Sequence, residues 1–186
     1  MRIVAGKWRG RRLRTPKGRS VRPTADRVRE AIFDILGDKT EGAWVLDLFS
    51  GTGALGLEAL SRGASAAVLV ESDPRAFAVL RRNIEELEAC DAEALPMDYR
   101  AALRLLRGRG SRFRLALLDP PYGKGIAERA AGELAGSGIV EPGGTVVIEE
   151  AVRAGEPSFP AGWEREQNRR YGDTRVTLFT VREEPT

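Results

Sequence analysis

The chain alternates between two patterns of apolar residues, one with helical spacing and one of short continuous runs. The first helical pattern covers residues 24–36, where Thr24 can cap the start and Gly37 can stop the end. Short apolar runs, each long enough for one buried strand, follow at residues 43–49, 66–72 and 114–118. Helical spacing returns between them at residues 54–63, 74–87 and 98–108. This alternation predicts crossover units and an α/β fold, a parallel sheet with helices on both faces.

The last third of the chain first continues this pattern and then departs from it. Residues 145–150, TVVIEE, follow the turn EPGG and predict another buried strand. Two late runs, 163–170 and 175–181, predict an antiparallel pair that closes the sheet. A chain of 186 residues that is 42% hydrophobic and 31% charged can bury one sizeable core. We therefore expect a single compact domain with at most a small appendage.

The basic residues are concentrated near the N-terminus. Residues 1–29 contain eleven Lys or Arg and a single acid, Asp26, although the whole chain carries a net charge of only +3. A basic arm on an acidic body favours a partner with a phosphate backbone, because each neutralised phosphate releases a counterion. The alternative is a solvated tail. Four apolar residues interrupt the charges, Ile3, Val4, Trp8 and Leu13, and would allow the arm to form a short hairpin around Gly6 or Gly10.

The composition disfavours several classes of function. No apolar run approaches the ~18 residues of a membrane span, and the N-terminus lacks the apolar centre of a secretory signal. A cytoplasmic protein is therefore expected. The chain has no histidine and one cysteine, Cys90, which excludes the usual zinc ligand sets and any internal disulfide. We expect no metal.

A glycine-rich loop lies between the first predicted strand of the sheet and the helix that follows it. Gly51, Gly53 and Gly56 have the spacing G-x-G-x-x-G, and Glu71 stands twenty residues after Gly51 at the end of the next strand. Glycines let the backbone approach a nucleoside cofactor, and an acid at the second strand end can accept hydrogen bonds from both ribose hydroxyls. This pattern alone suits NAD and S-adenosylmethionine equally well.

Asp47 favours S-adenosylmethionine over NAD. It stands four residues before Gly51, where a carboxylate would repel a pyrophosphate but attract the sulfonium and ammonium groups of S-adenosylmethionine. The alternative is that Asp47 only caps the following turn. We interpret Ser50 and Thr52 as loop hydrogen-bonding residues rather than nucleophiles, because no histidine base can activate them. Asp98, after a weak third strand, either accepts from the adenine amino group or lies in a surface turn.

Asp119, Pro120, Pro121 and Tyr122 follow the apolar strand 114–118, at the edge of the sheet that carries the glycine loop. The exocyclic amine of a nucleic-acid base is a poor nucleophile because its lone pair is delocalised into the ring. The Asp119 carboxylate and the Pro120 carbonyl can hold its two N–H bonds, and Tyr122 can stack on a base withdrawn from its neighbours. The motif predicts S-adenosylmethionine-dependent methylation of a base amine, with a structural turn as the alternative.

Six segments of the chain together resemble the bacterial 16S ribosomal RNA guanine-N2 methyltransferases, the small-subunit RNA methyltransferase D family of the class I fold. They are RIVAGKWRGRRL, RPTADRVREAIFDIL, LDLFSGTGALGLEALSRGA, VESD, LLDPPY and RRYGDTRVTLF. The two N-terminal segments are the most specific, since the glycine loop and LLDPPY occur throughout the superfamily. The resemblance implies a Rossmann-like, seven-stranded, mostly parallel sheet preceded by an N-terminal hairpin and helix, and a guanine of the small ribosomal subunit as the target.

The resemblance also implies roles for individual residues. Residues 1–22 would form an RNA-contacting arm and residues 23–186 the methyltransferase domain. The expected cofactor-binding residues are Asp47, Ser50, Gly51, Thr52, Gly53, Glu71 and Asp98. The expected catalytic residues are Asp119, Pro120, Pro121 and Tyr122, although related enzymes often carry asparagine at the first of these positions. The positive charge of the arm, rather than the resemblance, predicts the RNA contacts Lys7, Arg9, Arg11, Arg12 and Arg22.

Three other functions fit parts of the same pattern. A DNA adenine-N6 or cytosine-N4 methyltransferase would use the DPPY motif equally well, but it normally needs an additional target-recognition domain. A non-catalytic RNA-binding assembly factor would not need Asp47, Glu71 and the DPPY motif intact. A NAD-dependent dehydrogenase would need a hydride-transfer partner, for which there is no candidate. The sequence therefore predicts a monomeric, S-adenosylmethionine-dependent methyltransferase that acts on 16S ribosomal RNA.

Overall fold

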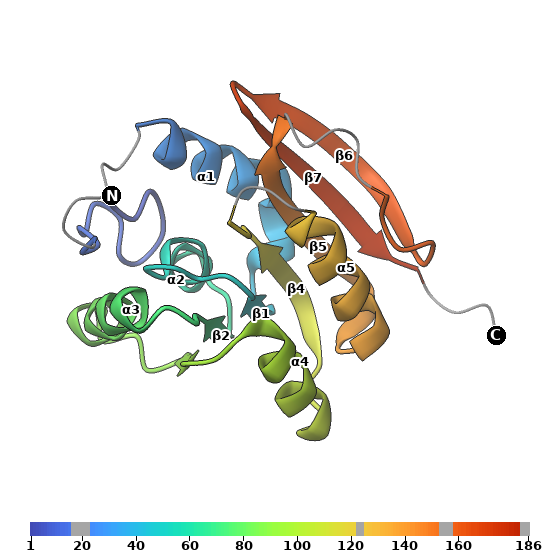
Figure 1. Cartoon of the computed structure of the whole chain (residues 1–186). Coiled ribbons are helices and arrows are strands. Elements are labelled where there is room, and N and C mark those ends of the chain that lie inside the picture. Colours follow the sequence, from blue (N-terminus) through green and yellow to red (C-terminus); the bar gives the residue numbers. More distant parts are fainter. Residues whose placement is uncertain (16–22, 122–124, 153–157, 183–186) are drawn as a thin grey trace.

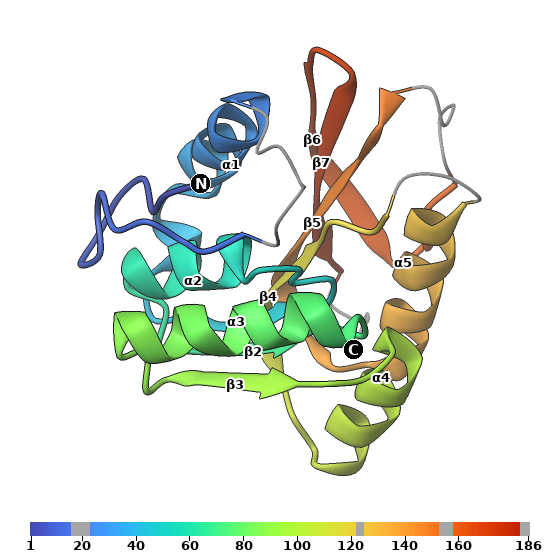
Figure 2. The same ribbon diagram turned by 60° about the vertical axis from the view of Figure 1, so that its left-hand side comes forward.

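The computed structural model describes residues 1–15, 23–121, 125–152 and 158–182, which form one seven-stranded sheet with helices on both faces (Figures 1 and 2). The strand order is β3-β2-β1-β4-β5-β7-β6. The five strands β1 to β5 run parallel, whereas β7 pairs antiparallel with both β5 and β6. The prediction of a Rossmann-like, mostly parallel sheet closed by an antiparallel pair is confirmed.

Strands and helices alternate through the first two thirds of the chain. The strands are β1 (Trp44–Asp47), β2 (Ala66–Val70), β3 (Ala92–Leu95), β4 (Phe113–Leu118), β5 (Val140–Ala151), β6 (Trp163–Tyr171) and β7 (Thr174–Val181). The α-helices are α1 (Pro23–Leu36), α2 (Ala54–Ser61), α3 (Pro74–Leu87), α4 (Tyr99–Gly108) and α5 (Ile126–Ser137), and the 3-10 helix η1 (Gly37–Thr40) follows α1.

Two elements differ from the sequence-based prediction. Helix α5 was not predicted, because its many alanines and glycines give a weak apolar stripe. Strand β5 begins at Val140, five residues earlier than predicted, and the EPGG segment is a bulge within it rather than a turn before it. The pairing with β4 jumps from Phe113–Val140 to Leu115–Thr145, so four residues of β5 lie opposite one residue of β4.

The sheet separates two hydrophobic clusters. One face packs against α1, α2 and α3, with fully buried side chains such as Ile32, Leu57 and Leu80. The other face packs against α4 and α5 through residues such as Leu106 and Leu134. Figure 2 shows the same two layers on either side of the strands. Both faces are therefore covered, as apolar strands in a parallel sheet require.

The N-terminal residues 1–15 lie over α2 and α3 rather than extending into solvent (Figure 2). Arg2 and Arg12 form a single antiparallel bridge, and backbone hydrogen bonds join Ile3 to Arg11 and Leu13 to Met1. This arrangement is a compact hairpin-like loop. None of the helices in the described parts of the chain is long and apolar enough to cross a membrane.

Candidate active site

A cavity of about 950 Å³ opens at the carboxyl edge of the parallel strands. Its walls come from the loops that follow β1, β2, β3 and β4, the position at which open α/β sheets bind their ligands. The predicted site residues that line it are Ser50, Gly51, Thr52, Glu71, Asp98, Asp119, Pro120 and Pro121. Asp47 and Gly53 lie outside the cavity wall, and Tyr122 and Arg22 lie outside the described residues.

The glycine loop forms a tight turn between β1 and α2. Gly53 has a φ of +87°, and a Cβ atom there would lie 2.5 Å from a Leu80 methyl group, so only glycine fits. The Gly51 N–H donates to Glu71 Oε2 at 2.9 Å, and the Ser50 hydroxyl donates to the Val70 carbonyl at 2.8 Å. The end of β2 therefore fixes the position of the loop that follows β1.

Asp47 lies beneath this loop, fully buried. Its Oδ2 accepts from the Gly56 N–H at 2.9 Å, while its Oδ1 has no hydrogen-bond partner among the described residues. Burial raises the pKa of Asp47 to about 7, and the nearby carboxylates of Asp119 and Glu71 add to the shift. Glu71 and Asp119, which line the cavity, therefore lie close to Asp47 behind its wall. Three carboxyl groups gathered in this way favour a cationic ligand.

Glu71 directly follows β2, and Asp98 lies in the segment after β3. Glu71 Oε1 accepts from the Asp73 N–H at 2.6 Å, so its carboxylate joins the glycine loop to the start of α3. Asp98 caps α4 by accepting from the Arg100 N–H at 2.9 Å. Both residues line the cavity, so each combines a structural hydrogen bond with a position from which it can reach a ligand.

Asp119 and Pro120 directly follow β4 and face the cavity from the side opposite Glu71 along the sheet edge. Pro120 is buried, whereas Pro121 is exposed. Burial raises the pKa of Asp119 to about 6. A carboxylate with this pKa is ionised near neutral pH but holds a proton more readily than an exposed aspartate, which suits a group that contacts an amine N–H.

The N-terminal arm also forms part of this cavity, a contact that the sequence-based prediction did not include. Met1 and Thr15 line it, and the Thr52 hydroxyl donates to the Met1 sulfur at 3.8 Å. Buried Asn83 of α3 donates to the Thr52 carbonyl at 2.8 Å and accepts from the Arg14 N–H at 2.7 Å. A polar residue in the apolar stripe of α3 was the available signal for this contact.

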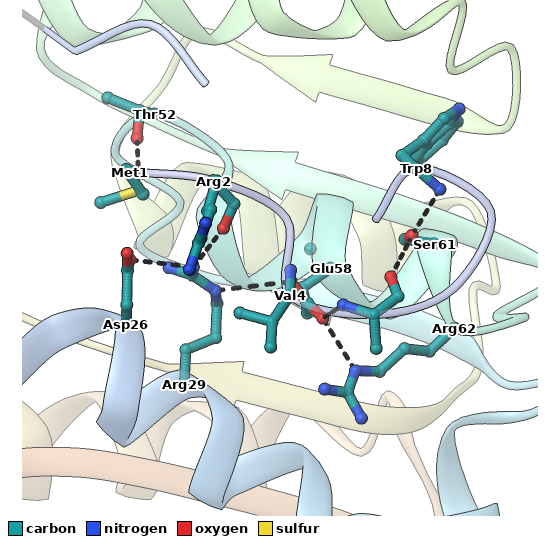
Figure 3. Close-up of polar contacts among 12 residues, drawn as sticks. Met1, Arg2, Val4, Trp8, Asp26, Arg29, Thr52, Glu58, Ser61 and Arg62 are labelled. Carbon is teal, nitrogen blue, oxygen red and sulfur yellow. Dashed lines mark hydrogen bonds and ion pairs between the residues drawn. The ribbon is translucent and has the colours of Figure 1, made fainter. Parts of the chain in front are cut away.

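A buried carboxylate holds the arm on α2 (Figure 3). Glu58 is fully buried and accepts from the N–H groups of Val4 at 2.7 Å and Ala5 at 2.9 Å. It also pairs with Arg62 at 2.8 Å and with buried Arg29 at 3.5 Å. The first fifteen residues are therefore a docked element, and the alternative of a solvated tail is wrong for them.

The four proposed RNA contacts within this docked element, Lys7, Arg9, Arg11 and Arg12, are all exposed. The Arg11 guanidinium donates to the Glu86 carbonyl at 2.5 Å, while the arm's backbone is held by Glu58 and Asn83. The arm thus presents charged side chains from a fixed backbone next to the cavity. In the described residues, no group of three or more His, Cys, Asp or Glu side chains could hold a metal ion.

A parallel sheet with one reversed strand inserted beside β5, a glycine loop after β1 and an acid after β2 together define a class I S-adenosylmethionine-dependent methyltransferase fold. The family model described as conserved hypothetical protein 95 matches residues 1–180. The chain is 35% identical to ribosomal RNA small subunit methyltransferase D of Escherichia coli, over 96% of this chain and 89% of that protein. The chain belongs to the ribosomal RNA small subunit methyltransferase D family.

Two solved structures agree with this assignment. The Escherichia coli protein yhhF has a TM-score of 0.89 at 34% identity, covering 99% of each chain. A hypothetical protein of Thermus thermophilus has a TM-score of 0.81 at 36% identity, covering 97% of this chain and 99% of that one. The predicted family is therefore confirmed.

Proposed function

We propose that this protein transfers a methyl group from S-adenosylmethionine to the exocyclic N2 amine of one guanine in the 16S RNA of the small ribosomal subunit. The observation that carries the proposal is that the Asp119–Pro120 segment opens into the same cavity as the glycine loop and Glu71. A base amine and a nucleoside cofactor can therefore meet at one sheet edge. The family relationship supports ribosomal RNA as the source of the base.

The cavity fits the cofactor on charge grounds. Glu71 and Asp119 line it, and Asp47, buried behind its wall, has one oxygen with no hydrogen-bond partner among the described residues. When bound, S-adenosylmethionine supplies an electrophilic methyl group on a positively charged sulfur, together with an ammonium group. Glu71 would accept hydrogen bonds from the ribose hydroxyls, and Asp98 from the adenine amino group. Asp47 stabilises the positive charge from below.

Asp119 then orients the amine. Its carboxylate and the Pro120 carbonyl would accept hydrogen bonds from the two N–H groups of the amine, so that the nitrogen lone pair points towards the methyl group. With the donor bound, the new N–C bond would form as the S–C bond of the donor breaks, and the bond electrons would remain on sulfur. The amine becomes positively charged and loses one proton, which the Asp119 carboxylate can accept and pass to solvent. The preorganised acceptors thus stabilise the charge that develops on the nitrogen.

The proposal is tested with small ribosomal subunits that lack the modification. The protein is incubated with them and with methyl-labelled S-adenosylmethionine, and the methylated nucleoside is identified by mass spectrometry. We expect the label in N2-methylguanosine. Label in adenosine, or label only in DNA offered in a parallel reaction, would contradict the guanine assignment, and the second result would instead support a DNA amino-methyltransferase.

Replacing Glu71 with Ala should weaken the binding of S-adenosylmethionine and S-adenosylhomocysteine by about 1–3 kcal/mol, because charge-assisted hydrogen bonds to the ribose are lost. Isothermal titration calorimetry measures this change. Glu85→Ala is the matched control, since it removes an exposed glutamate of α3 that does not line the cavity. Equal affinity losses in the two variants would assign the effect to the change in net charge rather than to a ribose contact.

The pH profile should show the ionisation of Asp119, whose pKa is raised to about 6 by burial. Below that pH the carboxyl group is protonated and can no longer accept the proton that leaves the amine, so kcat/KM should fall about tenfold per pH unit on the acidic side if this proton transfer limits the reaction. The Asp119→Asn variant cannot titrate at this position. A profile that keeps the same acidic limb in Asp119→Asn would assign the ionisation to another group, such as Asp47.

A further inference from the structure

The end of the β6–β7 hairpin, residues 168–175, contains the last residues of β6, the turn at Gly172 and Asp173 and the first residues of β7. This hairpin end, here called the β6–β7 turn, lies at the same edge of the sheet as the candidate active site. Strand β5 runs parallel to β4, and its last residue, Ala151, pairs with Thr174 at the start of antiparallel β7. The end of β6 and the start of β7 are therefore at the carboxyl edge, and Figure 1 shows this turn at the opposite end of the sheet from α4's last residues. Three strand spacings separate β4 from β6, a distance of ~14 Å.

This turn carries two arginines whose charge is not neutralised. Arg169 and Arg170 are exposed, and the described residues place no carboxylate within ion-pair distance of either one. The Arg169 Nε donates to the Gln167 side chain at 3.3 Å, and the Arg170 Nε donates to the Gly172 carbonyl at 3.0 Å. In contrast, exposed Arg81, Arg100 and Arg109 each pair with a glutamate.

The pairing of the two strands brings a third arginine, Arg175, next to this pair. Arg170 lies directly opposite Arg175, and like charges at opposed positions of an antiparallel pair are unfavourable. Arg175 is partly compensated by Glu150 at 3.3 Å on the neighbouring strand. The turn also contains one acid, Asp173. Arg169 and Arg170 are consecutive residues of β6, so their side chains lie on opposite faces of the hairpin. The end of the hairpin therefore presents positive charge on both faces, which favours an anionic partner.

We propose that Arg169 and Arg170 bind phosphate groups of the substrate RNA, as a second contact surface on the other side of the cavity from the arm. This inference rests on the proposed function, because it takes the substrate to be RNA. The arm covers α2 and α3, whereas the β6–β7 turn lies beyond β4 and β5 along the sheet edge. An RNA whose target base enters at Asp119 would extend towards both surfaces.

The test is the double variant Arg169→Ala/Arg170→Ala, compared with Arg104→Ala/Arg107→Ala as the matched control. The control arginines are exposed on α4, whose last turn lies at the opposite edge of the sheet, so both variants lose the same charge. Binding to unmodified small subunits is measured by filter binding across a series of salt concentrations. We expect the turn variant to bind about tenfold more weakly than the wild type. The slope of log binding constant against log salt concentration, the salt slope, should become shallower by about 2, one unit per phosphate contact.

The control variant should bind as the wild type does, and the turn variant should keep its affinity for S-adenosylhomocysteine and its melting temperature. The charge-preserving variant Arg169→Lys/Arg170→Lys should retain the salt slope. Wild-type binding by the turn variant, or an equal loss in the control, would overturn the inference. A wild-type protein that binds small subunits but transfers no methyl group to them would instead overturn the proposed function, so the two failures are distinguishable.

Discussion

The Asp119→Ala variant is expected to lose a factor of about 10²–10³ in kcat on small subunits, with folding and cofactor binding preserved. The carboxylate accepts an N–H of the target amine, and that hydrogen bond strengthens as positive charge develops on the nitrogen during transfer. Interactions that are stronger in the transition state than in the ground state act on kcat rather than on KM. Single-turnover rates at saturating cofactor and subunit measure the loss directly.

The Asp119→Asn variant separates two contributions of this side chain. Asparagine keeps one oxygen acceptor of similar size but cannot accept the departing proton. If orientation of the amine dominates, Asp119→Asn should retain much of the wild-type rate. Cofactor affinity and melting temperature, measured on the same preparations, confirm that each variant is folded. Near-normal turnover by Asp119→Ala would remove the segment after β4 from the catalytic centre.

Local sequence patterns predict the parallel part of the sheet and the edge of the sheet at which the candidate active site lies. Buried strands appear as short apolar runs, and the polar residues that end them, Ser50, Glu71 and Asp119, must lie at one edge because the strands are parallel. The strand order, with β1 between β2 and β4, was not predicted, because it depends on pairing between distant segments. The cavity confirms that these strand ends converge, while the chemical role of each residue stays a prediction.

The contacts that local patterns did not predict are those between distant segments. The Asn83 side chain accepts a hydrogen bond from the Arg14 N–H, 69 positions away in the sequence. The Glu58 carboxylate accepts one from the Val4 N–H, 54 positions away. Hydropathy assigns Glu58 to a surface, because a single acid in ALGLEALS has no local indication of a partner. Only the docking of the arm supplies the two N–H donors and the two guanidinium groups that let the carboxylate be buried.

The largest effect on stability is expected from Glu58→Ala, which should lower the free energy of unfolding by about 3–5 kcal/mol. The substitution leaves Arg29, whose side chain is 3% exposed, without its partner in α2. It also leaves the N–H groups of Val4 and Ala5 without their acceptor, each a partly buried donor. For a chain of this size the melting temperature should fall by roughly 10 °C.

Glu86→Ala is the matched control, because it removes the same side chain from a helix beneath the arm. Glu86 pairs with Arg14 at 2.5 Å, but the two side chains are 43% and 57% exposed, so the loss should be below about 1 kcal/mol. The double variant Glu58→Leu/Arg29→Met should recover part of the stability lost in Glu58→Ala, since no unpaired charge then remains buried. If Glu58→Ala melts no lower than Glu86→Ala, the arm is held by the apolar contacts of Ile3 and Leu13 rather than by the buried carboxylate.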